Sequence, residues 1–150
     1  MNVYVDSSAL LALFETKDRY HEAAKAEWRR LTDDRASLVT SSLVAVECHS
    51  LVQSRLGLEA ALDLQTLVLA LVRLIWVDEG TYRRGITDVF AAARKDLGLV
   101  DCVSFLVMRD HGITHAFTFD KHFAAEGFEV LPPPATTDPC SEPSGTRTSR

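Results

Sequence analysis

Four acidic residues stand at positions from which a side chain could bind a metal ion or take part in catalysis. Asp6 and Asp120 each directly follow a short apolar segment with strand character. Asp101 opens an apolar helical segment, and Glu47 lies inside another one. Each of the four positions also has a purely structural explanation, and the chemical interpretation has to compete with it.

The three aspartates can be explained singly as helix N-caps. Asp is a preferred capping residue because its carboxylate accepts hydrogen bonds from the free N–H groups of the first helical turn. Asp6 precedes Ser7-Ser8 and an apolar helical segment, and Asp120 precedes a short helical segment over 121–123. Asp101 stands at the start of the helix predicted for 102–110. Taken alone, each aspartate therefore favours a capping role.

Glu47 lacks this explanation because it lies within a helix. Its neighbours three or four positions away are Leu43, Val44 and Leu51, so the helical period places its carboxylate on the apolar face. A carboxylate there is costly unless it is paired or bound to a cation. The structural alternatives are a buried ion pair and a helix edge that turns toward solvent.

Together, the four carboxylates indicate a site for a divalent cation. If the strands before Asp6 and Asp120 are parallel, their carboxyl ends meet at one edge of the sheet, where such folds bind ligands. A converging set of carboxylates would repel itself without a counter-ion. Mg²⁺ and Mn²⁺ prefer carboxylate and water oxygens. A site of this kind can activate water and stabilise the displacement of a phosphodiester.

Strands and helices alternate along the chain. Strands are predicted over 3–5, 37–40, 75–77, 115–119 and 128–131. Helices are predicted over 9–14, 18–32, 42–56, 58–74, 81–97 and 102–110. The Leu-rich helix over 58–74 and Trp76 are expected to be largely buried, and Gly98 is expected to end the helix before it. The alternation predicts an α/β fold with a mostly parallel sheet of four to five strands and helices on both faces.

Composition restricts the classes of protein to consider. The 150 residues are 47% hydrophobic and carry a formal net charge of −5, which suits one globular domain and disfavours a strongly basic nucleic-acid clamp. No apolar run reaches the roughly 18 residues of a membrane span. The N-terminus lacks the basic region of a signal peptide, so a cytoplasmic protein is expected. The three cysteines are far apart and predict neither a disulfide framework nor a zinc site.

All five prolines lie beyond residue 131, in a polar segment with few large apolar side chains. Such a segment cannot bury enough surface to offset its ordering entropy. We therefore expect a folded domain over 1–132 and a disordered tail over 133–150.

Other catalytic motifs are missing from the sequence. It contains no GxxxxGK[ST], GxGxxG, HExxH or GxSxG segment. The five histidines show no paired ligand spacing, and His122 is expected to be solvated or packed rather than to bind phosphate. Asp96 is expected in an exposed last helical turn, as an outer acidic residue at most.

Four short segments carry a resemblance to a known family: 3–10 (VYVDSSAL), 40–47 (TSSLVAVE), 99–105 (LVDCVSF) and 116–132, which begins AFTFDKHF. In this order and spacing they resemble the PIN-domain nucleases and, within them, the VapC-type toxins of type II toxin–antitoxin systems. The resemblance covers residues 2–132. Val100 and Gly98 depart from it, because many relatives carry hydroxyl residues there, and some loss of hydrogen bonding around the site is expected.

The resemblance implies a PIN-like three-layer fold and an Mg²⁺-dependent endoribonuclease, with Mn²⁺ able to substitute. It implies that the metal-site carboxylates are Asp6, Glu47, Asp101 and Asp120, and that Ser8 and Thr118 support them by hydrogen bonding. It also implies an RNA substrate, a homodimer and a cognate antitoxin, for which the helices over 43–74 and the acidic cluster offer surfaces.

Three alternatives remain open from the sequence. A catalytically silent PIN-like RNA-binding or scaffold module would be favoured by loss of an acidic residue, but all four are present. A solitary PIN nuclease would have no antitoxin. A phosphatase with an aspartate nucleophile requires DxD after the first strand, and the sequence reads Asp6-Ser7-Ser8.

Overall fold

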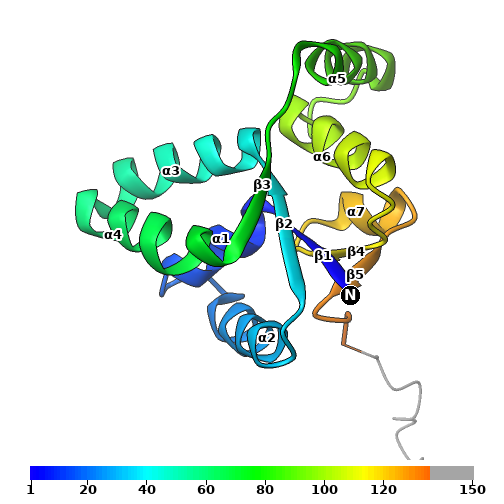
Figure 1. The fold of residues 1–150 in the computed structure, drawn as a ribbon. Helices are drawn as coiled ribbons and strands as arrows, with labels where there is room; N and C mark the ends of the chain where they lie inside the picture. Colours follow the sequence, from blue (N-terminus) through cyan, green and yellow to red (C-terminus); the bar gives the residue numbers. More distant parts are fainter. Residues whose placement is uncertain (136–150) are drawn as a thin grey trace, which may run out of the picture.

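The computed structural model describes residues 1–135 and consists of a central parallel sheet between two layers of helices (Figure 1). The strands are β1 (Asn2–Val5), β2 (Ser37–Ser41), β3 (Val72–Ile75), β4 (His115–Phe117) and β5 (Glu129–Leu131). The helices of the first half are α1 (Ser7–Phe14), α2 (His21–Asp33), α3 (Ser42–Leu56) and α4 (Leu58–Asp63). Those of the second half are α5 (Glu79–Ala92), α6 (Leu99–Asp110) and α7 (Lys121–Ala125).

The five strands are all parallel and lie in the order β3-β2-β1-β4-β5. The chain therefore builds one half of the sheet outward from β1 and then returns to build the other half from β4. In Figure 1, α1, α3 and α4 lie on one side of the sheet, and α6 and α7 lie on the other. The predicted α/β class, the parallel sheet and the helices on both faces are confirmed.

The centre of the sheet is buried on both faces. Val3, Tyr4 and Val5 of β1 are all fully buried, as expected for a strand covered by helices on each side. The Tyr4 hydroxyl satisfies its hydrogen bond inside this core by donating to Ser104 Oγ of α6 at 2.7 Å. Because β1 and β4 are adjacent, the residues that follow them are brought together at one edge of the sheet.

The predicted helix over 58–74 is wrong in extent and burial. Helix α4 ends at Asp63 and is followed by a π-helical turn (Leu64–Val68), a 3₁₀ turn (Leu69–Leu71) and then β3. Residues from Val72 onward pair with β2, so β3 starts three residues earlier than the strand predicted over 75–77. Several of the leucines are exposed rather than buried, namely Leu58, Leu62, Leu67 and Leu71. Trp76 is also exposed, at 76%, rather than in the core.

The predicted helix over 81–97 ends earlier than expected. Helix α5 stops at Ala92 because Ala93 adopts a left-handed conformation, with φ at 49°. Gly98 does not end this helix but is the N-cap of α6. The expectation for a tail over 133–150 falls mostly on residues 136–150, which lie outside the described residues, so the domain boundary stays a prediction. In the described part, no helix is both long and apolar enough to cross a membrane.

Helix α5 packs closely on α6, and Gly85 makes this approach possible. A Cβ atom at Gly85 would lie 2.5 Å from Val103 Cγ2 and 3.2 Å from Leu99 Cδ1. These two residues flank Asp101 on α6, so the contact between the helices helps to fix the position of that aspartate.

A matched pair of glycine substitutions in α5 tests this packing. We expect Gly85→Ala to lower the free energy of unfolding by about 1–3 kcal/mol, because the added methyl group overpacks the contact with α6. Gly80→Ala is the control, since its Cβ would meet only Asp78 Oδ1 at an ordinary 3.6 Å. Urea unfolding should show that Gly80→Ala is neutral or stabilising. Equal effects of the two substitutions would contradict the packing.

Candidate active site

Asp6 is the first residue after β1, and its side chain is almost completely buried. Its backbone N–H donates to the Phe117 carbonyl of β4 at 3.0 Å, which continues the pairing of β1 with β4. Its carboxylate caps α1 by accepting from the Ser8 N–H at 3.3 Å. The capping explanation is therefore correct for Asp6, but it accounts for only part of the environment of the carboxylate.

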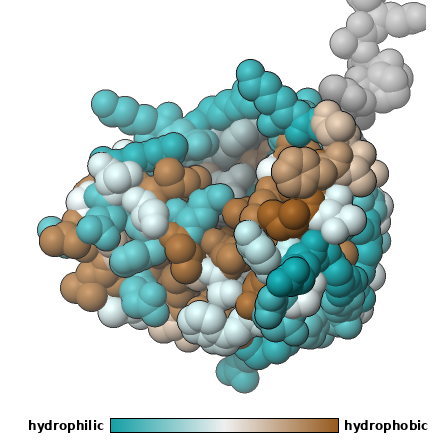
Figure 2. Space-filling model, turned by 90° about the horizontal axis from the view of Figure 1, so that it is seen from above, coloured by the Kyte–Doolittle hydropathy of each residue, from teal (hydrophilic) through white to brown (hydrophobic). Residues whose placement is uncertain are grey.

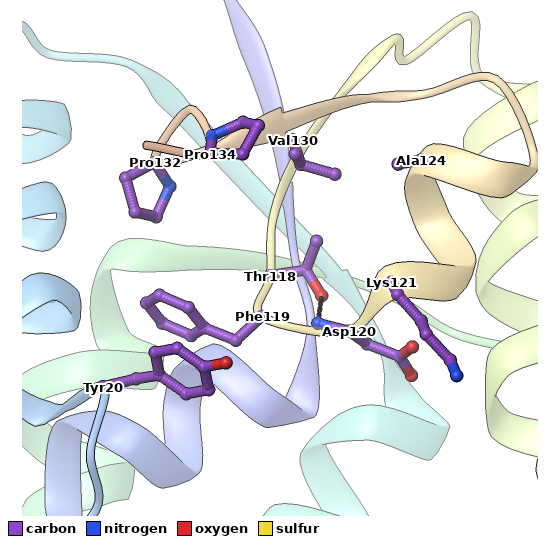
Figure 3. A pocket seen from close by; sticks show the side chains of 9 residues that line it. All are labelled: Tyr20, Thr118, Phe119, Asp120, Lys121, Ala124, Val130, Pro132 and Pro134. Atoms are coloured by element: carbon purple, nitrogen blue, oxygen red, sulfur yellow. Dashed lines mark hydrogen bonds between the residues drawn. The ribbon is translucent and has the colours of Figure 1, made fainter. Parts of the chain in front are cut away.

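Two hydroxyl groups hold the same carboxylate oxygen. Ser8 Oγ and Thr118 Oγ1 donate to Asp6 Oδ2 at 2.7 and 2.9 Å. Each hydroxyl also accepts a backbone N–H from the segment after β4, from Phe119 at 2.9 Å and from Asp120 at 2.9 Å. Figure 3 shows the bond between Thr118 and the Asp120 N–H. Ser8 and Thr118 thus connect the ends of β1 and β4, and their support of a metal site stays a prediction.

Asp120 caps α7 and is joined to a chain of polar side chains. Its Oδ1 accepts from the His122 N–H at 2.9 Å and lies 2.6 Å from His122 Nδ1. His122 Nε2 in turn lies 3.0 Å from Asp96 Oδ2, which also accepts from Arg94. Burial alone lowers the pKa of His122, but its hydrogen bonds with Asp96 and Asp120 outweigh burial and raise it.

The structure corrects the expectation for Asp96. This residue lies in the turn after α5 rather than in a last helical turn, and it reaches the acidic cluster through His122. His122 is packed, as expected, with only 8% of its surface exposed. No signal in the sequence predicts this link, because Asp96 was expected inside the helix over 81–97 and the early end of α5 does not follow from the helical period.

Asp101 lies in the first turn of α6 and accepts from the Gly98 N–H at 3.2 Å. Burial, together with the negative charges of Asp6 and Asp120, raises the pKa of Asp101 to about 6 against the effect of that hydrogen bond. The three aspartates, which come from three separate segments of the chain, are therefore close enough to repel one another.

Glu47 is half-buried on α3, and the residues described by the structure offer its side chain no hydrogen bond or ion pair. The alternative of a buried ion pair is therefore not supported. The next residue, Cys48, packs against the start of α1, with its Sγ 3.9 Å from the Ser7 carbonyl. Burial, together with the negative charges of Asp6 and Glu47, raises the pKa of Cys48. Glu47 thus contributes negative charge to the same edge of the sheet.

The donor set suits a hard, hydrated cation. Within residues 1–135, neither Lys nor Arg forms an ion pair with Asp6, Glu47, Asp101 or Asp120. No three His, Cys, Asp or Glu side chains of that range are arranged to hold one metal ion by themselves. Mg²⁺ usually keeps several waters and contacts only one or two carboxylates directly. Carboxylates without a Lys or Arg partner at this edge therefore fit hydrated Mg²⁺ or Mn²⁺ better than an ion that takes all its ligands from the protein.

Comparison with known proteins places the chain in a family. The model of the PIN domain family matches residues 3–129. This chain belongs to the PIN domain family. The matched range contains all four acidic residues, and the PIN fold is the parallel sheet with flanking helices described above.

One curated relative of this PIN protein is similar over nearly its whole length. The 23S rRNA-specific endonuclease VapC20 of Mycobacterium tuberculosis is 32% identical over 132 residues, which cover 87% of this chain and 98% of the relative. The crystal structure of VapC20, described as a sarcin–ricin loop cleaving toxin, superimposes with a TM-score of 0.73 at 30% identity. That match covers 84% of this chain and 95% of the VapC20 chain.

More distant solved structures share the fold. VapBC2 from Rickettsia felis, bound to a promoter DNA fragment, matches with a TM-score of 0.65 at 12% identity. FitAcB from Neisseria gonorrhoeae matches with a TM-score of 0.62 at 17% identity. Each match covers 87% of this chain, with 97% of the R. felis chain and 96% of the N. gonorrhoeae chain. At these identities the comparison supports the fold alone.

Substitution of Thr118 tests the hydroxyl network around Asp6. Thr118→Val keeps the shape of the side chain but removes a donor to Asp6 and an acceptor for the Asp120 N–H. We expect the free energy of unfolding to fall by about 1–3 kcal/mol, because buried polar groups lose their partner.

Thr87→Val is the control for the loss of a threonine hydroxyl, because Thr87 is exposed on α5 and bonds only the Arg83 carbonyl of its own helix. For this variant, urea unfolding should show a change of less than about 0.5 kcal/mol in the free energy of unfolding. A Thr118→Val protein as stable as Thr87→Val would show that the network does not hold the site together.

Proposed function

We propose that this PIN protein is an Mg²⁺-dependent endoribonuclease and the toxin of a toxin–antitoxin pair. The observation that carries the proposal is the buried Asp6 carboxylate, which has no cationic partner among the described residues and raises the pKa of Asp101. Asp6 lies beyond the carboxyl ends of β1 and β4, where the order of the strands reverses. Parallel α/β sheets bind ligands at such a point. The similarity to VapC20 over nearly the full length of both chains supports the same reaction class.

In this proposal Asp6, Glu47, Asp101 and Asp120 would hold the metal directly or through its waters, and neighbouring side chains fix their positions. Such an ion supplies an activated water and stabilises the negative charge of a phosphodiester displacement. Ser8 and Thr118 fix the Asp6 carboxylate, so that it does not reorganise when charge develops. His122 orients Asp120, and Asp96 orients His122.

The substrate proposed is a structured RNA, and the first candidate is the sarcin–ricin loop of 23S rRNA. This loop is named as the target of VapC20, which is 30% identical in the superimposed structures. The formal net charge of −5 argues against broad electrostatic capture of nucleic acid. A defined loop recognised by shape and local contacts is more compatible with this charge. A cytoplasmic location, where such RNA is found, is part of the proposal.

Cleavage assays with a charge-neutral variant test the proposal. Asp6→Asn removes one charge without a change in size, so we expect RNA cleavage in Mg²⁺ or Mn²⁺ to fall at least about 100-fold while the protein stays folded. Asp88→Asn, an exposed aspartate on α5, is the control and should cleave normally.

Full cleavage in excess EDTA, or full activity of Asp6→Asn, would contradict the proposed mechanism. A folded, RNA-binding protein that never cleaves under any of these conditions would instead favour a silent PIN-like binding module.

An exposed apolar surface on α3, α4 and the following turn offers a site for partners. Figure 2 shows apolar side chains gathered at this end of the molecule, among polar ones. The exposed side chains include Val46, Leu58, Leu62 and Leu67. We propose that a second copy of the chain packs here, and that an antitoxin reaches the acidic cluster with an arginine that replaces the charge of the metal.

Sedimentation and co-expression test these partners. At about 50 µM the wild-type protein should sediment as a dimer, and Leu62→Lys should shift it toward monomer because a charge then lies in the apolar contact. Phe90→Lys on α5, which is 77% exposed, is the control.

Co-expression with the product of an adjacent small gene should relieve growth arrest. A wild-type monomer would exclude the dimer, and a failure to relieve arrest would favour a solitary nuclease.

A further inference from the structure

A cavity of about 340 Å³ opens directly beside the acidic cluster and is not used by the mechanism described above. It lies between the segment after β4 and the segment after β5 (Figure 3). In this view Phe119 and Tyr20 lie on one side of the cavity, and Pro132 and Pro134 lie on the other. Its volume is in the range of small-ligand sites, and its mostly apolar lining includes two aromatic rings and two proline rings.

The aromatic side of the cavity is an ordered stack. The rings of Tyr20 and Phe119 are nearly parallel, at 11°, with their centroids 4.5 Å apart. Arg19 adds its guanidinium group 4.6 Å from the centroid of Tyr20. The Tyr20 backbone N–H is fixed by Asp18 Oδ1 at 2.7 Å, just before α2 begins. Phe119 is only half-buried, so this stack presents an aromatic surface to the cavity.

The cavity and the acidic cluster meet at three consecutive residues. Asp120 belongs to the cluster and Thr118 donates to Asp6, and both also line the cavity, with Phe119 between them. Lys121 lies at the same end of the cavity as Asp120 and is exposed. A ligand with its flat part between Phe119 and the prolines would therefore place an attached anionic group beside Asp120 and Lys121.

We propose that this cavity binds one nucleobase of the RNA substrate, unstacked from its neighbours and held between Phe119 and the Pro132–Pro134 segment. The inference rests on the proposed ribonuclease function and adds how the substrate is positioned. A base with its own phosphate has the required chemistry, a flat ring system attached to an anion. Because the cavity offers stacking surfaces rather than a set of hydrogen-bonding groups, purines are favoured over pyrimidines through their larger area.

The test combines kinetics with a fluorescent base. Phe119→Leu removes the aromatic face, and Ala124→Trp fills the cavity from α7 without altering the stack. For both variants we expect KM for a sarcin–ricin loop hairpin to rise by about 10- to 100-fold, the value of one stacked base, with kcat changed far less. Phe90→Leu, at an exposed aromatic position on α5, is the control and should leave KM unchanged.

Binding is measured without cleavage on hairpins that carry 2-aminopurine at one loop position at a time, with Ca²⁺ in place of Mg²⁺ and the RNA checked for integrity. When wild-type protein binds, 2-aminopurine at one loop position should be quenched, because this base leaves its neighbours and stacks on Phe119. Phe119→Leu and Ala124→Trp should abolish this quenching while Phe90→Leu retains it.

The outcomes separate this inference from the proposed function. Metal-dependent RNA cleavage with KM and quenching unaltered in both cavity variants would overturn the base site and leave the nuclease intact. An absence of cleavage would remove the proposed function, and the quenching experiment would still decide whether the cavity binds a base. Loss of antitoxin binding in the two variants, with RNA kinetics unchanged, would show that the cavity receives a protein side chain instead.

Discussion

The structure depends on one buried carboxylate, that of Asp6, at the point where the parallel sheet reverses its strand order. Burial of a charge without a cation is costly, and here two hydroxyl groups from opposite sides of this point offset part of the cost. The same hydroxyls accept N–H groups from the turn that carries Asp120. Burial raises the pKa of Asp6, and the hydrogen bonds that counteract this effect also set the position of a second acidic residue.

The order of the strands explains why acidic residues distant in the sequence meet. Because β1 pairs with both β2 and β4, the ends of β1 and β4 are adjacent, and α6 brings Asp101 to the same edge. The close packing of α5 on α6 at Gly85 and the bond from Tyr4 to Ser104 fix α6 against the sheet. The repulsion among the three aspartates is then a consequence of the fold, and a divalent cation is the chemical means of relieving it.

The sequence predicted the convergence of the aspartates better than it predicted some of the elements around them. Acidic residues after strands could be recognised because the alternation of strands and helices implies a parallel sheet, whose carboxyl ends form one edge. The prediction of one helix over 58–74 was wrong because the same apolar pattern is compatible with a buried helix and with a broken helix followed by a strand. Contacts between loops, such as His122 with Asp96 and Tyr20 with Phe119, depend on loop shapes that no period in the sequence encodes.

The most direct test of a metal ion at Asp6 is the binding of Mn²⁺ by the protein alone, measured by electron paramagnetic resonance of the free ion during titration. Wild-type protein should remove Mn²⁺ from solution in a saturable manner, and Asp6→Asn, still folded, should bind it much more weakly. Wild-type protein that binds no Mn²⁺, or Asp6→Asn that binds it equally well, would contradict the claim that this buried carboxylate holds a metal ion.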